Sequence, residues 1–169
     1  MRITDLLKAC SVELNGTPQT KEETIKQMVA LMEKGGNVTD VEKYKAGVFA
    51  REEEGTTGIG EGIAIPHAKT DAVNAPGLAA MVIPAGVDYD ALDGQPVDLV
   101  FLIAAPNTED NVHLEVLSRL SMLLMDESFK QNLLKAKTVE EFLAVVDRAE
   151  NAKNEAEEEK AVNEPDSGY

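Results

Sequence analysis

The sequence has little of several residue types, and each shortage excludes a class of protein. One cysteine among 169 residues excludes a disulfide framework and a multi-cysteine zinc site within the chain, and it fits a reducing compartment. Sixteen Lys and Arg stand against 31 Asp and Glu, a net charge of −15, which disfavours binding to nucleic acid or to an anionic membrane surface. No apolar run reaches the roughly 20 residues of a membrane-spanning helix, and no signal peptide is visible.

The remaining composition is that of a soluble globular protein. Hydrophobic residues make up 43% of the chain, and the length suits one domain with a sizeable core. The composition changes near residue 150, where a Glu-rich segment with almost nothing to bury begins. We therefore expect a domain over residues 1–150 and an acidic tail or interdomain linker over residues 151–169.

Five segments have the features of amphipathic helices. Three begin with a Thr that is followed three residues later by a Glu, the spacing of a capping box: Thr20, Thr39 and Thr138. Apolar residues at helical spacing follow each of them. Two more helices are expected over residues 111–124 and 127–135, the second capped by Asp126.

The middle of the chain is typical of buried strands. Short aliphatic stretches bounded by Gly or Pro lie at 62–66, 78–83 and 97–103, and a further short strand is expected at 11–14. A turn at Asp93-Gly94 without an intervening helix indicates an antiparallel pair. Because strands buried on both faces need helices on both sides, we predict an α/β fold: a three-layer α/β/α sandwich around a small mixed sheet.

A glycine-rich loop over residues 55–62 leads into the strand that is expected to end at Pro66-His67. Its N–H groups could approach an anion closely, because glycine has no Cβ. The loop matches neither a Walker A motif nor the dinucleotide fingerprint, so a nucleotide site is not expected. Pro66 restricts the backbone around His67, which we expect at a rigid edge of the sheet, although a histidine hydrogen-bonded in a loop is the simpler interpretation.

The second histidine, His113, falls in the first turn of a predicted helix. Free backbone donors and the positive end of the helix dipole favour an anion there. A metal held by the two histidines with Asp71, Glu61 or Glu115 is the rival interpretation. The paired-ligand spacing of metal sites is missing, so no metal is expected.

Residues 58–69, Gly-Ile-Gly-Glu-Gly-Ile-Ala-Ile-Pro-His-Ala-Lys, resemble the phosphorylation-site signature of the fructose/mannitol-type enzyme IIA of the bacterial phosphoenolpyruvate:sugar phosphotransferase system. The similarity continues through residues 97–106 and 113–120 and covers about residues 1–150. On this resemblance, His67 matches the phosphorylated histidine, His113 the second active-site histidine and Arg51 the arginine before the signature.

The resemblance implies a phosphotransferase component that works through a phosphohistidine. The phosphoryl group would pass from the phosphorylated phosphocarrier HPr to His67 and then to a cysteine of a IIB domain, possibly on the same longer chain, with fructose the first expected sugar and mannitol the next. No cofactor is implied, and the location would be cytoplasmic, with membrane association only through IIB and IIC. His113, the loop N–H groups and Arg51 would stabilise the phosphoryl oxygens.

Several alternatives remain open at this point. Arg51 could instead be a helix-terminal cation, and Lys69 is interpreted as a rim or docking residue. A nitrogen-related regulatory phosphorylation switch would use the same histidine but signal by binding partners. A non-catalytic cytoplasmic binding module is the third possibility, against which the intact pair of His67 and His113 argues.

Overall fold

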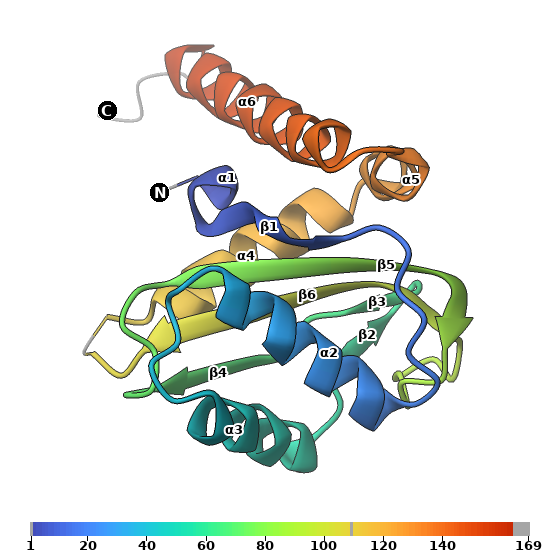
Figure 1. The fold of residues 1–169 in the computed structure, drawn as a ribbon. Helices are drawn as coiled ribbons and strands as arrows, with labels where there is room; N and C mark the ends of the chain where they lie inside the picture. The colour runs from blue at the N-terminus through green and yellow to red at the C-terminus, as the bar shows by residue number, and fades with distance from the viewer. Residues whose placement is uncertain (1, 109, 164–169) are drawn as a thin grey trace.

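The computed structural model describes residues 2–108 and 110–163, which form one six-stranded sheet between two layers of helices (Figure 1). The strands are β1 (Leu7–Glu13), β2 (Gly58–Gly60), β3 (Ile63–Ala64), β4 (His67–Thr70), β5 (Gly77–Val87) and β6 (Val97–Pro106). The helices are α1 (Ile3–Leu6), α2 (Lys21–Lys34), α3 (Val41–Glu54), α4 (Val112–Leu124), α5 (Glu127–Lys135) and α6 (Val139–Asn163). Within the described residues, no helix has both the length and the apolar character needed to cross a bilayer.

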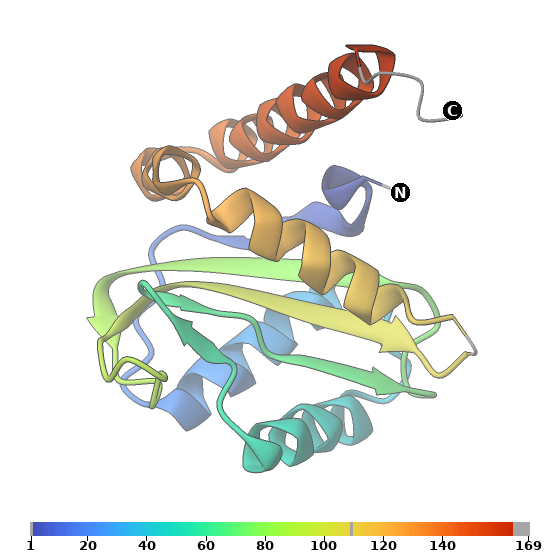
Figure 2. The same cartoon turned by 180° about the vertical axis from the view of Figure 1, so that it is seen from behind.

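The two faces of the sheet carry separate hydrophobic cores, which confirms the predicted three-layer sandwich. Helices α2 and α3 cover one face, and α4, α6 and the short α1 lie on the other (Figures 1 and 2). Strand β5 shows why both faces are buried: Ala79, Met81 and Ile83 belong to the first core, and the alternating Leu78, Ala80 and Val82 belong to the second.

The sheet is mixed, as predicted. Its order is β1-β5-β6-β3-β2, and β4 also pairs with β6. Strands β5 and β6 are antiparallel, which confirms the pair expected around the Asp93-Gly94 turn, whereas β1 is parallel to β5 and both β3 and β4 are parallel to β6.

The strand predicted over residues 62–66 is wrong in its extent. Strand β3 ends at Ala64, and His67 begins the separate strand β4 instead of ending a strand. Pro66 has no N–H to donate to a neighbouring strand, so it interrupts the ladder at this point. The segment over residues 58–69 therefore comprises a tight β2–β3 hairpin and the first residues of β4.

The predicted helix starts agree with the structure except at α3. Thr20 and Thr138 each accept a hydrogen bond from the N–H of the residue three positions later. Helix α3 is instead capped by Asp40, because the Thr39 hydroxyl donates to the Ala72 carbonyl at 3.0 Å. The box predicted at Thr39 was thus displaced by one residue, through a tertiary contact that the local sequence does not contain.

Helix α6 continues past the change in composition at residue 150. Glu150 is buried, and both of its carboxylate oxygens accept from the Ile3 N–H, at 2.9 and 3.0 Å. Asp147, one turn earlier, forms an ion pair with Arg2. The start of the chain therefore holds the helix at residues 147–150, and the helix extends to Asn163, beyond the start of the expected tail or linker at residue 151. Residues 164–169 lie outside the described part, and a linker role for 151–169 stays a prediction.

Candidate functional site

The backbone that carries His67 is fixed by its neighbours in the sheet. His67 stands opposite Ile103 in the parallel pairing of β4 with β6. The Ile103 N–H donates to the Pro66 carbonyl at 3.0 Å, and the buried Tyr44 hydroxyl donates to the Ile103 carbonyl at 2.9 Å. Burial raises the pKa of Tyr44, so this hydroxyl keeps its proton as a donor.

The half-buried imidazole of His67 is oriented by one hydrogen bond. Its Nδ1 lies 3.0 Å from the Ile65 carbonyl oxygen. Because a carbonyl oxygen can only accept, this contact requires a proton on Nδ1. In the neutral ring the lone pair is then on Nε2, the nitrogen on the far side of the ring from Ile65.

His113 lies in the first turn of α4 and faces His67. The centroids of the two rings are 6.3 Å apart, and the ring planes are inclined by 31°. The Nδ1 of His113 is buried and has no hydrogen-bond partner among the described residues. Burial, followed by the charges of His67 and Lys69, lowers the pKa of His113, so the neutral ring is favoured at neutral pH.

The start of α4 adds further groups that suit an anion. Asn111 precedes the helix, and within the described chain its side chain makes no capping hydrogen bond to the first turn. Its Oδ1 lies 3.5 Å from the Lys69 ammonium. The first N–H groups of a helix and a nearby ammonium together attract negative charge. The pair of histidines thus opens onto a region that favours a phosphoryl group.

Arg51 is placed at the end of α3. Its Nη1 donates to the Gly55 carbonyl at 2.9 Å, and its Nε lies 4.0 Å from a Glu54 carboxylate oxygen. In the described part of the chain, none of these contacts joins Arg51 to either histidine. The structure brings His67 and His113 together, whereas contact of Arg51 with a phosphoryl group stays a prediction.

The glycine-rich loop forms a turn between two short strands of the sheet. Gly60, Glu61 and Gly62 all have positive φ, of 100°, 57° and 76°, and form the turn between β2 and β3. The Glu61 N–H donates to the Asp93 carboxylate at 3.0 Å, and the Gly58 N–H donates to the Thr56 hydroxyl at 3.1 Å. These two N–H groups already donate to protein acceptors, and a contact of the other loop N–H groups with phosphoryl oxygens stays a prediction.

Sequence reasoning missed a buried polar cluster at the base of this loop. Glu52, Thr57 and Tyr89 are buried together, and the Lys21 ammonium reaches Glu52 at 2.9 Å. The helical spacing of the buried Tyr44 and Val48 continues to Glu52, so a carboxylate falls on the core-facing side of α3. The i+4 spacing from Val48 could have indicated that Glu52 is buried, but Glu52 stands in a run of Glu residues whose later members are exposed.

Two of the side chains considered as metal ligands, Asp71 and Glu115, form ion pairs with basic residues. Asp71 forms an ion pair with Lys43, and this ammonium lowers the pKa of the carboxyl group. Glu115 lies 3.4 Å from Arg119 in an i,i+4 pair. Within the described residues, no three His, Cys, Asp or Glu side chains converge on one point.

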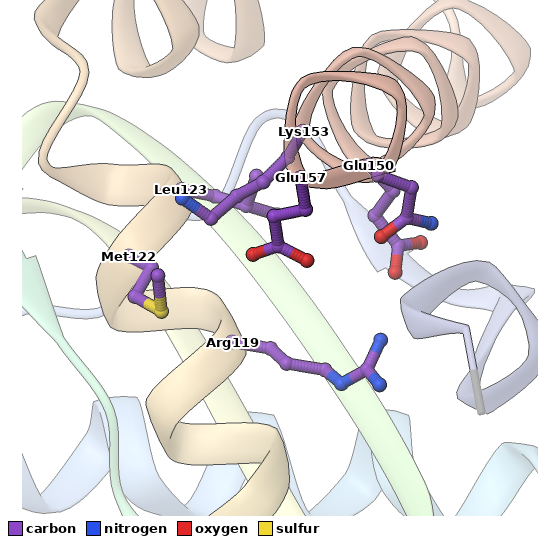
Figure 3. Close-up of a pocket in the computed structure, with 7 residues that line it drawn as sticks. Arg119, Met122, Leu123, Glu150, Lys153 and Glu157 are labelled. Carbon is purple, nitrogen blue, oxygen red and sulfur yellow. The ribbon is translucent and has the colours of Figure 1, made fainter. Parts of the chain in front are cut away.

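A pocket of about 160 Å³ lies between α4 and α6, away from the histidines (Figure 3). Arg119 and Met122 line it from α4, and Glu150, Lys153 and Glu157 line it from α6. Because acidic and basic side chains alternate around it, the pocket offers no charge of one sign to a ligand. The candidate site therefore remains the edge formed by His67, His113 and Lys69.

Comparisons with known proteins match nearly the whole chain to one family. The profile described as "Phosphoenolpyruvate-dependent sugar phosphotransferase system, EIIA 2" matches residues 5–149. The PTS system fructose-specific EIIABC component of Bacillus subtilis is 45% identical over 148 residues, which are 88% of this chain and 23% of that protein. The PTS system fructose-specific EIIA component of Haloferax volcanii is 40% identical over 152 residues, 86% of this chain and 99% of that protein.

Solved structures give the same result. The nitrogen regulatory protein IIA-Ntr of Neisseria meningitidis has a TM-score of 0.78 and 29% identity over 85% of this chain and 98% of that chain. The mannitol enzyme IIA of Escherichia coli, solved in complex with phosphorylated mannitol enzyme IIB, has a TM-score of 0.72 and 32% identity over 83% of this chain and 98% of that chain.

Proposed function

Because the chain belongs to the EIIA 2 family of the phosphoenolpyruvate-dependent sugar phosphotransferase system, we propose that His67 is the residue through which it carries the phosphoryl group. A component of this family is a phosphotransferase that works through a phosphohistidine intermediate. The observation that carries the assignment to His67 is the hydrogen bond from its Nδ1 to the Ile65 carbonyl, at 3.0 Å.

That hydrogen bond leaves Nε2 as the nucleophile. In the proposed step, the Nε2 lone pair attacks the phosphorus of a phosphohistidine on HPr, and a new P–N bond forms. The P–N bond to HPr breaks, and its electron pair stays on the departing imidazole of HPr. The transferring group carries charge on three equatorial oxygens, and catalysis of this kind depends mainly on positioning and electrostatic stabilisation.

His113, Lys69 and the start of α4 supply that stabilisation in our proposal. His113 can donate from a ring nitrogen to a phosphoryl oxygen, and the Lys69 ammonium adds a positive charge beside Asn111. The phosphoryl dianion on His67 then favours the protonated form of His113. The described contacts of Arg51 are to Gly55 and Glu54 and not to either histidine, so we give it a smaller part.

The acceptor in this proposal is a cysteine of a IIB domain. Support comes from the solved complex of a mannitol enzyme IIA with its phosphorylated IIB, and from the relative named as an EIIABC component. Two relatives with high identity are named fructose-specific, so fructose is the sugar that we propose for the pathway. The transfers would occur on the cytoplasmic side, and the chain would meet the membrane only through IIC.

A nitrogen-related regulatory role is the second candidate function. It is favoured by the high structural similarity to a nitrogen regulatory IIA protein. That role would use the same phosphohistidine, so the two candidates differ in whether the phosphoryl group moves on to IIB.

Intact-mass measurement after incubation with phosphoenolpyruvate, enzyme I and HPr tests the proposal. We expect one acid-labile phosphoryl adduct on the wild type and on His113→Ala, and none on His67→Ala. Addition of a fructose-type IIB should remove the adduct from the wild type. An adduct that persists would favour the regulatory role, and a folded wild type without any adduct would contradict the carrier function and leave a binding module.

A further inference from the structure

A buried carboxylate lies behind the histidine edge, and the transfer reaction as described above makes no use of it. Glu52, in the last turn of α3, is 9% exposed, and its neighbours Thr57 and Tyr89 are 4% and 0% exposed. A carboxylate in such surroundings is destabilising unless its charge is balanced and its oxygens accept hydrogen bonds. Its partners therefore determine what it does.

All four groups around Glu52 are donors. Oε2 accepts from the Lys21 ammonium at 2.9 Å and from the Thr57 N–H at 3.1 Å. Oε1 accepts from the Tyr89 hydroxyl at 3.0 Å and from the Thr57 hydroxyl. An ionised carboxylate, which accepts at both oxygens and donates nothing, satisfies all four of these donors and balances the Lys21 charge. Thr57 is thus held at both its main-chain N–H and its side chain.

Thr57 is connected to His67 by two hydrogen bonds, one between main-chain groups and one from the His67 imidazole to a main-chain carbonyl. The Thr57 carbonyl accepts from the Ile65 N–H at 3.0 Å. The carbonyl of the same Ile65 accepts from the His67 Nδ1–H at 3.0 Å. A displacement of Thr57 therefore shifts Ile65, whose carbonyl orients the imidazole. Glu52 itself is too deeply buried, behind Thr57, to meet the phosphoryl group.

We propose that Glu52 is a positioning residue for phosphoryl transfer. By fixing Thr57, and through it Ile65, the carboxylate holds His67 in the tautomer that carries its proton on Nδ1 and keeps Nε2 free. The inference rests on the proposed function of His67 as the carrier. The tautomer of His67 can be measured before any phosphoryl group is bound, so the role of Glu52 can be tested separately from the carrier function.

Nitrogen-15 NMR of histidine in the full chain, together with the rate of phosphoryl uptake, tests the role. Glu52→Gln removes the charge that pairs with Lys21 and replaces one accepting oxygen with an NH₂ group, so the hydrogen bonds that hold Thr57 are weakened or reversed. We expect wild-type His67 as the Nδ1–H tautomer, a mixture of tautomers in Glu52→Gln, and a rate constant lowered by about 10- to 100-fold with KM for phosphorylated HPr unchanged. Glu53→Gln, the same change at the exposed neighbour on the same helix, should match the wild type.

Thr57→Val supplies a second variant that keeps the N–H and carbonyl of residue 57 and removes only the hydroxyl. It should shift the tautomer and the rate in the same direction by a smaller factor, and it decides the question if Glu52→Gln does not fold. A folded Glu52→Gln protein in which His67 keeps the wild-type tautomer overturns the proposal, whatever its transfer rate. If the wild type accepts no phosphoryl group, the carrier function fails, while the tautomer still reports whether Glu52 positions His67.

Discussion

The two ends of the segment from Glu52 to His67 differ in whether the buried polar groups around them have hydrogen-bond partners. At the Glu52 end, every donor around the buried carboxylate has an acceptor. At the histidine end, His113 Nδ1 is buried without a partner among the described residues, and Asn111 does not cap α4 there. Buried polar groups that are fully partnered fix a geometry, whereas those left open are available to a ligand. We therefore expect the cluster around Glu52 to position His67, and the edge with His113 to bind the phosphoryl group.

The largest expected effect comes from breaking the partnered end. Glu52→Ala should lower the free energy of unfolding by about 2–4 kcal/mol, because the buried hydroxyls of Thr57 and Tyr89 lose their acceptor. Burial is the largest cause that raises the pKa of Tyr89, and it persists in this variant, so the hydroxyl does not ionise to relieve the loss. Urea denaturation gives the value, with Glu53→Ala as the exposed control. An equal fall in the free energy of unfolding of Glu52→Ala and Glu53→Ala would show that the hydrogen bonds of the buried carboxylate do not stabilise this end.

At the open end, a substitution should affect transfer and leave stability unchanged. His113→Ala is expected to slow transfer from phosphorylated His67 to IIB by about 10- to 100-fold, because a donor to the phosphoryl oxygens is lost. Rapid-quench kinetics measures the rate. Ser118→Ala on the exposed side of the same helix is the control. A large fall in the free energy of unfolding of His113→Ala would show that this residue is structural after all.

The hairpin between the two ends depends on Gly62. Its φ is +76°, and a Cβ there would lie 2.7 Å from Asp98 Oδ1 and 2.8 Å from Lys130 Nζ. Gly62→Ala should cost about 2–3 kcal/mol of unfolding free energy, while Gly94→Ala, with a φ of +70° and open space around it, should cost about 1 kcal/mol. Thermal unfolding of both variants measures the difference in unfolding free energy. Because the two φ angles are similar, the close atoms around Gly62 should account for that difference.

The smallest effect concerns pH. Burial, then His67 and Lys69, hold the pKa of His113 below 6.5, so the unfolded chain binds more protons than the folded chain just below that pH. The free energy of unfolding should therefore decrease through this group as the pH falls below 6.5. Lys69→Met should raise the NMR titration midpoint of His113, since one nearby cation is lost. Lys26→Met on α2, across the sheet, should leave it unchanged.

Much of the fold followed from local pattern. Alternating and continuous apolar stretches predicted the buried strands, and the caps at Thr20, Asp126 and Thr138 marked three helix starts correctly. The failures lie where distant segments decide the outcome. Thr39 is diverted by the Ala72 carbonyl, and α6 is extended because the Ile3 N–H requires Glu150 as an acceptor.

The sequence by itself determined the family, the three layers and the two histidines that face each other, because these depend on periodicity and on a long, specific motif. Only the tertiary structure decided that the glycine loop is a closed hairpin and that Glu52 is connected to His67 through Thr57 and Ile65. These contacts depend on how donors and acceptors from separate elements meet in three dimensions. The spacing of residues along the chain does not predict such contacts.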